Sequence, residues 1–114
     1  YANAEDITKE IRLELNKACD DFKAVYNRDN EFICALYNLG NIYYRLQDYD
    51  KAEETYSQVL QHDPKFAEAF YNRGLTLIMK GQVDKGLSDL SQAGEYGLYS
   101  AYNLIKRYSK NKKE

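Results

Sequence analysis

The sequence contains no tryptophan, and it has only one proline, one histidine and one methionine among its 114 residues. Glycine occurs only six times, whereas alanine, leucine, lysine and glutamate are plentiful. Sandwiches and barrels need many Gly- and Pro-rich turns, and no segment here alternates in the manner of a β-strand. The composition therefore predicts an all-α fold.

The scarcity of metal ligands argues against a metal centre. His62 is the single histidine, and Cys19 and Cys34 do not form a CxxC pair. Tetrahedral zinc requires four such ligands, so we expect no metal site. The two cysteines are interpreted as small apolar core residues rather than as a disulfide.

Arrangements typical of catalysis are also missing. The carboxylates of Asp20-Asp21 and Glu53-Glu54 are adjacent in sequence, and adjacent residues on a helix do not face each other. His62 has no nucleophile and carboxylate at triad spacing, and the sequence has no glycine-rich phosphate loop. We therefore expect no enzyme, no catalytic residue and no cofactor.

The charges are nearly balanced. Sixteen basic and eighteen acidic residues give a net charge of −2 and are interspersed over most of the chain, which argues against a nucleic-acid binder. The basic run from Lys106 to Lys113 is interpreted as a solvated helix end. No apolar run approaches the roughly 18 residues of a membrane span, so no membrane insertion is expected. No targeting segment is recognisable, and the compartment stays open.

One short motif recurs. "YNLG" at residues 37–40 returns as "YNRG" at 71–74 and in part as "YNLI" at 102–105, at intervals of 34 and 31 residues. A fixed period of this size is typical of stacked repeats. Apolar residues at steps of three and four predict helices that include residues 32–46, 52–60, 66–78, 83–93 and 98–108, with breaks at Gln47-Asp48, Asp63-Pro64, Gly81-Gln82 and Gly97. Before them, an unbroken helical phase without Gly or Pro predicts one long helix from about Asp6 to Tyr26.

These residues resemble the tetratricopeptide repeat, a helix-turn-helix unit with the pattern W-x2-L-G-x2-Y, A-x3-F, P. Between residues 33 and 66 the pattern is met by Leu36, Leu39, Gly40, Tyr43, Ala52, Tyr56 and Pro64. Between 67 and 100 the match is looser, because Arg73, Leu77, Gly86 and Leu98 replace the expected types. Small residues such as Gly86 are expected where two helices approach closely.

The resemblance implies a right-handed superhelical stack of antiparallel helix pairs, with about two and a half repeats and a C-terminal capping helix. We expect a single domain over 1–114. It would consist of an N-terminal helix or degenerate repeat (1–30), two repeats (31–66 and 67–97) and a capping helix with its tail (98–114).

Members of this family typically hold a peptide or a partner helix on the concave side of the stack, so the resemblance implies a protein–protein interaction module. The residues expected to contact a partner are Tyr37, Asn38, Asn41, Tyr44, Arg45, Tyr71, Asn72, Leu75, Tyr102 and Asn103. Asparagine amides can hold a peptide backbone, and tyrosine offers a broad face with a hydroxyl. Tyr37, Tyr71 and Tyr102 are expected to form a row across the groove.

One alternative to a groove contact remains open. The Tyr-Asn pairs can serve the scaffold alone, in which case the chain is a structural fragment that packs against further repeats or self-associates as a homo-oligomer. The carboxylate clamp of some co-chaperones of this family is not supported. Asn41 and Asn72 match it, but Tyr37, Tyr99 and Asn103 stand at its basic positions.

Overall fold

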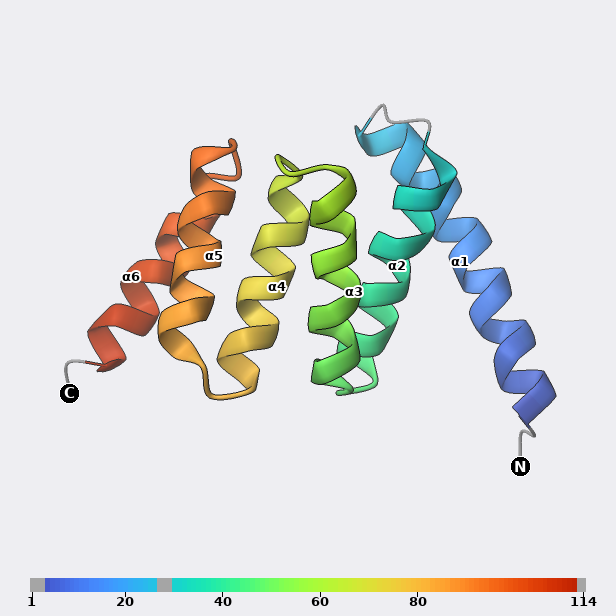
Figure 1. Cartoon of the computed structure of the whole chain (residues 1–114), viewed down its shortest axis with the longest axis horizontal. Helices are drawn as coiled ribbons and strands as arrows, with labels where there is room; N and C mark the ends of the chain where they lie inside the picture. The colour runs from blue at the N-terminus through green and yellow to red at the C-terminus, as the bar shows by residue number, and fades with distance from the viewer. Residues whose placement is uncertain (1–3, 27–29, 113–114) are drawn as a thin grey trace.

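The computed structural model describes residues 4–26 and 30–112, and these residues form six α-helices. They are α1 (Ala4–Tyr26), α2 (Glu31–Arg45), α3 (Tyr49–His62), α4 (Ala67–Met79), α5 (Val83–Glu95) and α6 (Ser100–Lys112). Figure 1 shows them side by side in chain order, each antiparallel to the one before, with the two termini at opposite ends of the row. The predicted all-α stack of helix pairs is confirmed.

The molecule is elongated. Its radius of gyration is 15.0 Å and its principal extents are 47 × 35 × 20 Å, whereas a compact chain of this length would have a radius of gyration of about 13 Å. Each helix packs against its neighbours in sequence, and α2 also contacts α4. Stacking therefore replaces a single central core, as the repeat period predicts. None of the described helices is long and apolar enough to cross a membrane.

The long first helix is confirmed, because α1 runs unbroken from Ala4 to Tyr26. Only its second half is well packed. Phe22 is 3% exposed and its ring lies 6.0 Å from that of Tyr37 and 5.7 Å from that of Phe66, whereas Leu13 is 63% exposed. In Figure 1 the first half of α1 leans away from the stack.

The interpretation of the cysteines as separate apolar residues is wrong. Cys19 of α1 and Cys34 of α2 form a disulfide, with Cα atoms 5.5 Å apart and a sequence separation of 15 residues. Cys34 is fully buried in the cluster that also holds Phe22 and Tyr37. The disulfide thus fixes the packed half of α1 to the first repeat.

The predicted breaks between helices are present, and the backbone conformation explains three of them. Gln47, Gly81 and Gly97 each have positive φ, at 62°, 87° and 109°, which ends the preceding helix in a left-handed residue. The helices α2 and α3 begin at side-chain caps. The Asn30 side chain accepts hydrogen bonds from the amides of Phe32 and Ile33, and the Asp48 side chain accepts one from the amide of Lys51.

Glycines mark three close contacts between helices. A Cβ atom on Gly86 would lie 2.6 Å from the carbonyl oxygen of Gly74, so α4 and α5 meet backbone to backbone. Gly40 and Gly94 instead lie under aromatic rings, those of Tyr56 and Tyr102. The expectation that Gly86 lies at a close crossing is confirmed.

Candidate functional site: the hollow between α2 and α4

Five of the ten residues expected to contact a partner come together in one place. They line a hollow of about 250 Å³, which we call the α2–α4 hollow. Its walls are formed by Asn41, Tyr44, Arg45, Tyr56, Asn72 and Leu75. The hollow is smaller than the roughly 300–1,000 Å³ of sites for drug-sized molecules, so its size matches one side chain or a short backbone segment.

Two asparagine amides at this hollow are oriented by a hydrogen-bond network. Asn72 Nδ2 donates to the Tyr37 hydroxyl and to Asn41 Oδ1, both at 3.1 Å, and the Tyr56 hydroxyl donates to Asn41 Oδ1 at 2.5 Å. These contacts use the amino group of Asn72 and the carbonyl oxygen of Asn41. Among the described side chains, Asn41 Nδ2 and Asn72 Oδ1 have no hydrogen bond, so one donor and one acceptor remain available.

Tyr56 was predicted as a repeat core residue and not as part of a site. It is 1% exposed, and burial, followed by the nearby hydroxyls of Tyr37 and Tyr44, raises its pKa. The hydroxyl therefore stays protonated and remains a donor to Asn41 at ordinary pH. The A-x3-F position identified the ring as buried, but nothing in the spacing placed its hydroxyl against Asn41.

Tyr44 is influenced electrostatically by tyrosines of other helices. Burial first, and then the hydroxyls of Tyr49, Tyr108 and Tyr71, raise the pKa of Tyr44. Tyr44, Tyr71 and Tyr108 belong to α2, α4 and α6, so tyrosines from three alternate helices are electrostatic neighbours. Tyr108 was counted only as an apolar position of the last helix.

Tyr37 and Asn38 are not on an open face. Both are 8% exposed; the Tyr37 ring stacks on Phe66 at 5.0 Å, and Asn38 Nδ2 donates to the carbonyl oxygen of Cys34. In this structure their side chains belong to the interior. Tyr37 reaches the α2–α4 hollow only indirectly, through the hydrogen bond that it accepts from Asn72.

The remaining predicted contact residues lie outside the hollow. Tyr71 is partly buried against the second core cluster, around Leu90 and Ala101, and Tyr102 is 40% exposed with its ring over Gly94. Asn103 is exposed. The predicted row Tyr37, Tyr71 and Tyr102 therefore does not form a continuous exposed surface.

Arg73 departs from the repeat pattern, but its charge is paired with that of a carboxylate. Arg73, which stands where leucine was expected, donates from Nε and Nη2 to the two carboxylate oxygens of Asp89 at 2.7 and 2.9 Å. Its Nη1 donates to Ser57 at 3.1 Å. The hydrogen bonds to Asp89 raise the pKa of Arg73. This side chain therefore ties α4 to both α5 and α3.

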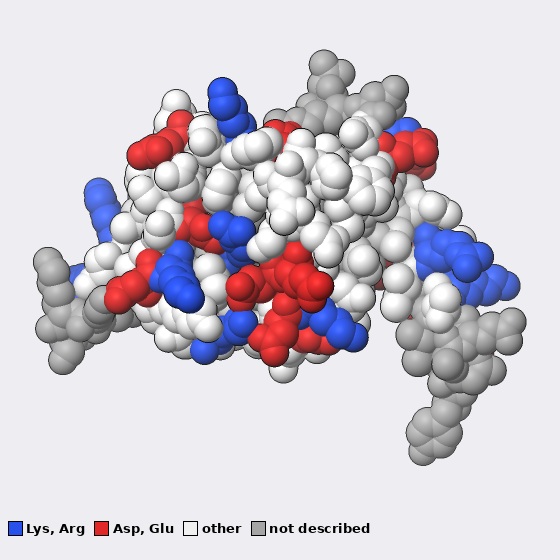
Figure 2. Space-filling model, viewed as in Figure 1, with Lys and Arg blue, Asp and Glu red and all other residues white. Residues whose placement is uncertain are grey.

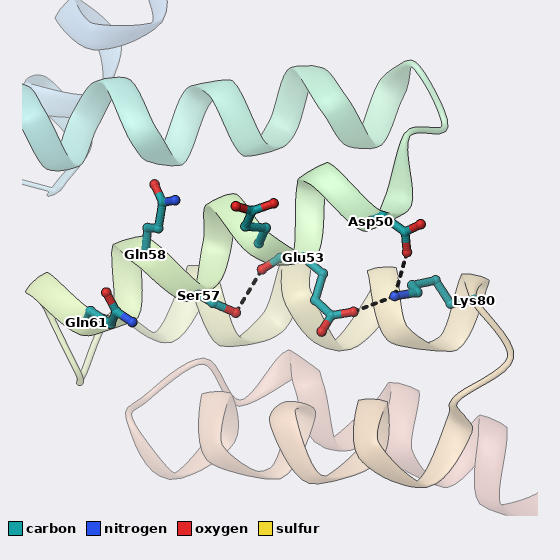
Figure 3. Close-up of a pocket in the computed structure, with 7 residues that line it drawn as sticks. Asp50, Glu53, Ser57, Gln58, Gln61 and Lys80 are labelled. Atoms are coloured by element: carbon teal, nitrogen blue, oxygen red, sulfur yellow. Dashed lines mark hydrogen bonds and ion pairs between the residues drawn. The ribbon is translucent and has the colours of Figure 1, made fainter.

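A second hollow, of about 540 Å³, lies along α3 and was not predicted. Figure 2 shows acidic side chains gathered over this part of the molecule, with basic ones beside them. Lys80 Nζ lies 2.8 Å from Asp50 and 2.7 Å from Glu53, and Figure 3 shows its side chain reaching between them. Because this lysine already pairs with Asp50 and Glu53, these two carboxylates are less available to a partner than the size of the hollow implies. The α2–α4 hollow, with its uncommitted amide atoms, is the better candidate.

Comparison with known proteins agrees with the fold. Residues 33–66 and residues 55–87 each match the tetratricopeptide repeat family. Residues 33–87 are tetratricopeptide repeats. The matched region covers α2, α3 and α4 and extends into α5, so the whole α2–α4 hollow lies within it.

Two curated proteins are similar to this chain. The photosystem I assembly protein Ycf3 of Acaryochloris marina is 34% identical over 61 residues, which cover 54% of this chain and 37% of that protein. The DnaJ homolog subfamily C member 7 of Homo sapiens is 37% identical over 54 residues, covering 47% of this chain and 11% of that protein. The aligned regions thus cover well under half of either relative.

Proposed function

We propose that this chain is a protein–protein interaction module that holds a peptide or helix of a partner protein in the α2–α4 hollow. The observation that carries the proposal is the pair of uncommitted amide atoms, Asn41 Nδ2 and Asn72 Oδ1, held in place by their hydrogen bonds to each other and to Tyr37 and Tyr56. A peptide group offers a carbonyl oxygen and an N–H, which match this donor and this acceptor.

The rest of the surroundings supports the same ligand. Leu75 and Tyr44 supply apolar contact, and the ring of Tyr49 lies 5.6 Å from that of Tyr44. Arg45 is the single charged residue that lines the hollow, and it already pairs with Glu14 of α1. Recognition would then depend on backbone amides and apolar contact rather than on charge.

Site-specific photo-crosslinking tests where a partner binds. A photoreactive phenylalanine analogue at position 44 should yield a cross-linked partner, whereas the same group at position 58, on the exposed side of α3, should not. Cross-linking at position 58 alone would contradict the proposal.

Calorimetry with the partner peptide then measures the energetics. Tyr44→Ala and Leu75→Ala should each weaken binding by about 1 kcal/mol or more, added salt should matter little, and Gln58→Ala should have no effect. Equal affinities for all three variants would place the ligand elsewhere.

A second candidate is self-association through α1. Its first half carries the 63% exposed Leu13, and Ile11 and Leu15 are only partly buried. Light scattering over a range of concentrations should then show a dimer that Leu13→Lys abolishes. A mass that stays monomeric throughout would remove this candidate.

A further inference from the structure

The two sulfur atoms of the Cys19–Cys34 disulfide have different surroundings. Cys34 is 0% exposed, within the core cluster. Cys19 is partly exposed and lines a hollow of about 510 Å³ between α1 and α2. Asn16, Asp20 and Phe32 also line this hollow and are exposed, so it opens to solvent. A reagent can therefore reach the disulfide from the Cys19 side.

The buried sulfur has a hydrogen-bond donor beside it. Asn38 Nδ2 donates to the carbonyl oxygen of Cys34 at 3.0 Å and lies 3.5 Å from Cys34 Sγ. Asn38 is itself 8% exposed, so water competes little for this amide. Burial of Cys34 disfavours a thiolate, and a donor at this place offsets part of that cost by stabilising negative charge on the sulfur when Cys34 leaves.

From these two observations we propose that the Cys19–Cys34 disulfide is a site of thiol–disulfide exchange, in which an external thiolate attacks Cys19 Sγ. A new bond forms between the external sulfur and Cys19 Sγ, the Cys19–Cys34 bond breaks, and Cys34 leaves as a thiolate that takes a proton from water. If the attacking molecule is a dithiol, its second thiolate displaces Cys19. The dithiol is then oxidised by two electrons, and both cysteines are reduced to thiols.

The inference is independent of the α2–α4 hollow, which contains neither cysteine. Once reduced, α1 would lose its covalent link to α2 and keep its non-covalent contacts, among them Phe22 against Tyr37 and Phe66 and the ion pairs Lys23–Glu31 and Arg45–Glu14. Exposed ion pairs contribute little, so exchange loosens the contact between α1 and α2.

The test uses the oxidised chain and reduced glutathione as the probe. After a short reaction, free thiols are trapped with N-ethylmaleimide and the peptides are analysed by mass spectrometry. We expect glutathione on Cys19 and maleimide on Cys34, in at least about tenfold excess over the reverse pair, because access decides which sulfur is attacked. Glutathione mainly on Cys34, equal labelling of both, or reaction only in denaturant would each overturn the proposal.

The role of Asn38 is tested by rate. Asn38→Ala should slow mixed-disulfide formation several-fold in the folded chain and leave the rate in denaturant unchanged, while the matched amide variant Gln58→Ala should react as the wild type does. Circular dichroism checks that both variants are folded. Should Asn38→Ala not fold, Asn38→Ser is measured in its place. A folded variant that reacts at the wild-type rate would remove Asn38 from the mechanism.

Discussion

The two helices of a repeat pack closely in both α2–α3 and α4–α5, but through different residues. In the first, Gly40 lies under the ring of Tyr56, so a small residue meets a large one. In the second, Gly74 and Gly86 bring two backbones into contact. Position 39 is leucine, but its counterpart 34 residues later is Arg73, which pairs with Asp89. The two repeats thus keep the same helix-pair geometry with different residues at matching positions, provided that each changed residue has a suitable contact on the facing helix.

The largest effect should come from filling the backbone contact of the second repeat. Gly86→Leu places a side chain where even a Cβ would lie 2.6 Å from the Gly74 carbonyl oxygen and from Ile78. We expect the free energy of unfolding to fall by about 3 kcal/mol, the upper end of typical overpacking costs, measured by denaturant titration. Lys85→Leu, at an exposed neighbouring position, is the control. An unchanged stability of Gly86→Leu would show that the two backbones are not in contact.

Replacing the arginine of the second repeat by the leucine of the first should have a smaller effect. Arg73→Leu leaves the 7% exposed Asp89 without its cation. Breaking a fully buried pair costs roughly 3–5 kcal/mol; because the Arg73 side chain is 23% exposed, we expect about 2 kcal/mol. The double variant Arg73→Leu/Asp89→Leu should recover most of this loss. A double variant less stable than Arg73→Leu would show that the ion pair contributes more than apolar packing can replace.

The smallest effect concerns the turns inside the repeats. Gln47 and Gly81 are 34 residues apart, and both have positive φ, which costs a residue with a side chain about 1–2 kcal/mol. Gln47→Gly should therefore stabilise the chain by about 1 kcal/mol, and Gly81→Gln should destabilise it by a similar amount. Thermal unfolding of both variants measures the difference. If the two variants shifted the unfolding temperature in the same direction, the turns at Gln47 and Gly81 would not share one backbone geometry.

The helices could be predicted because their signals are local. Steps of three and four, together with the stops at Gln47, Pro64, Gly81 and Gly97, define each helix without reference to the others. The close crossing at Gly86 also followed from the repeat pattern, which places small residues where the helices of a pair meet.

Most of what the sequence did not predict involves contacts between helices. Tyr37 and Asn38 have the residue types of a binding surface, but Phe22 and Phe66 pack against Tyr37 and bury it. The proximity of Tyr44 and Tyr108 joins residues 64 positions apart in sequence. Likewise, the packing of α1 against α2 decides whether Cys19 and Cys34 meet, and sequence spacing alone does not define that packing. Half of the residues expected to contact a partner therefore line the α2–α4 hollow, but the network of hydrogen bonds that orients them was not predicted.

The rings that cover glycines have a consequence for related sequences. Tyr56 lies on Gly40 and Tyr102 lies on Gly94, so in each case one residue supplies the space that the other fills. A larger residue at either glycine would have to be accompanied by a smaller one at its tyrosine. We expect positions 40 and 56, and likewise 94 and 102, to covary in evolution, each pair changing together or not at all.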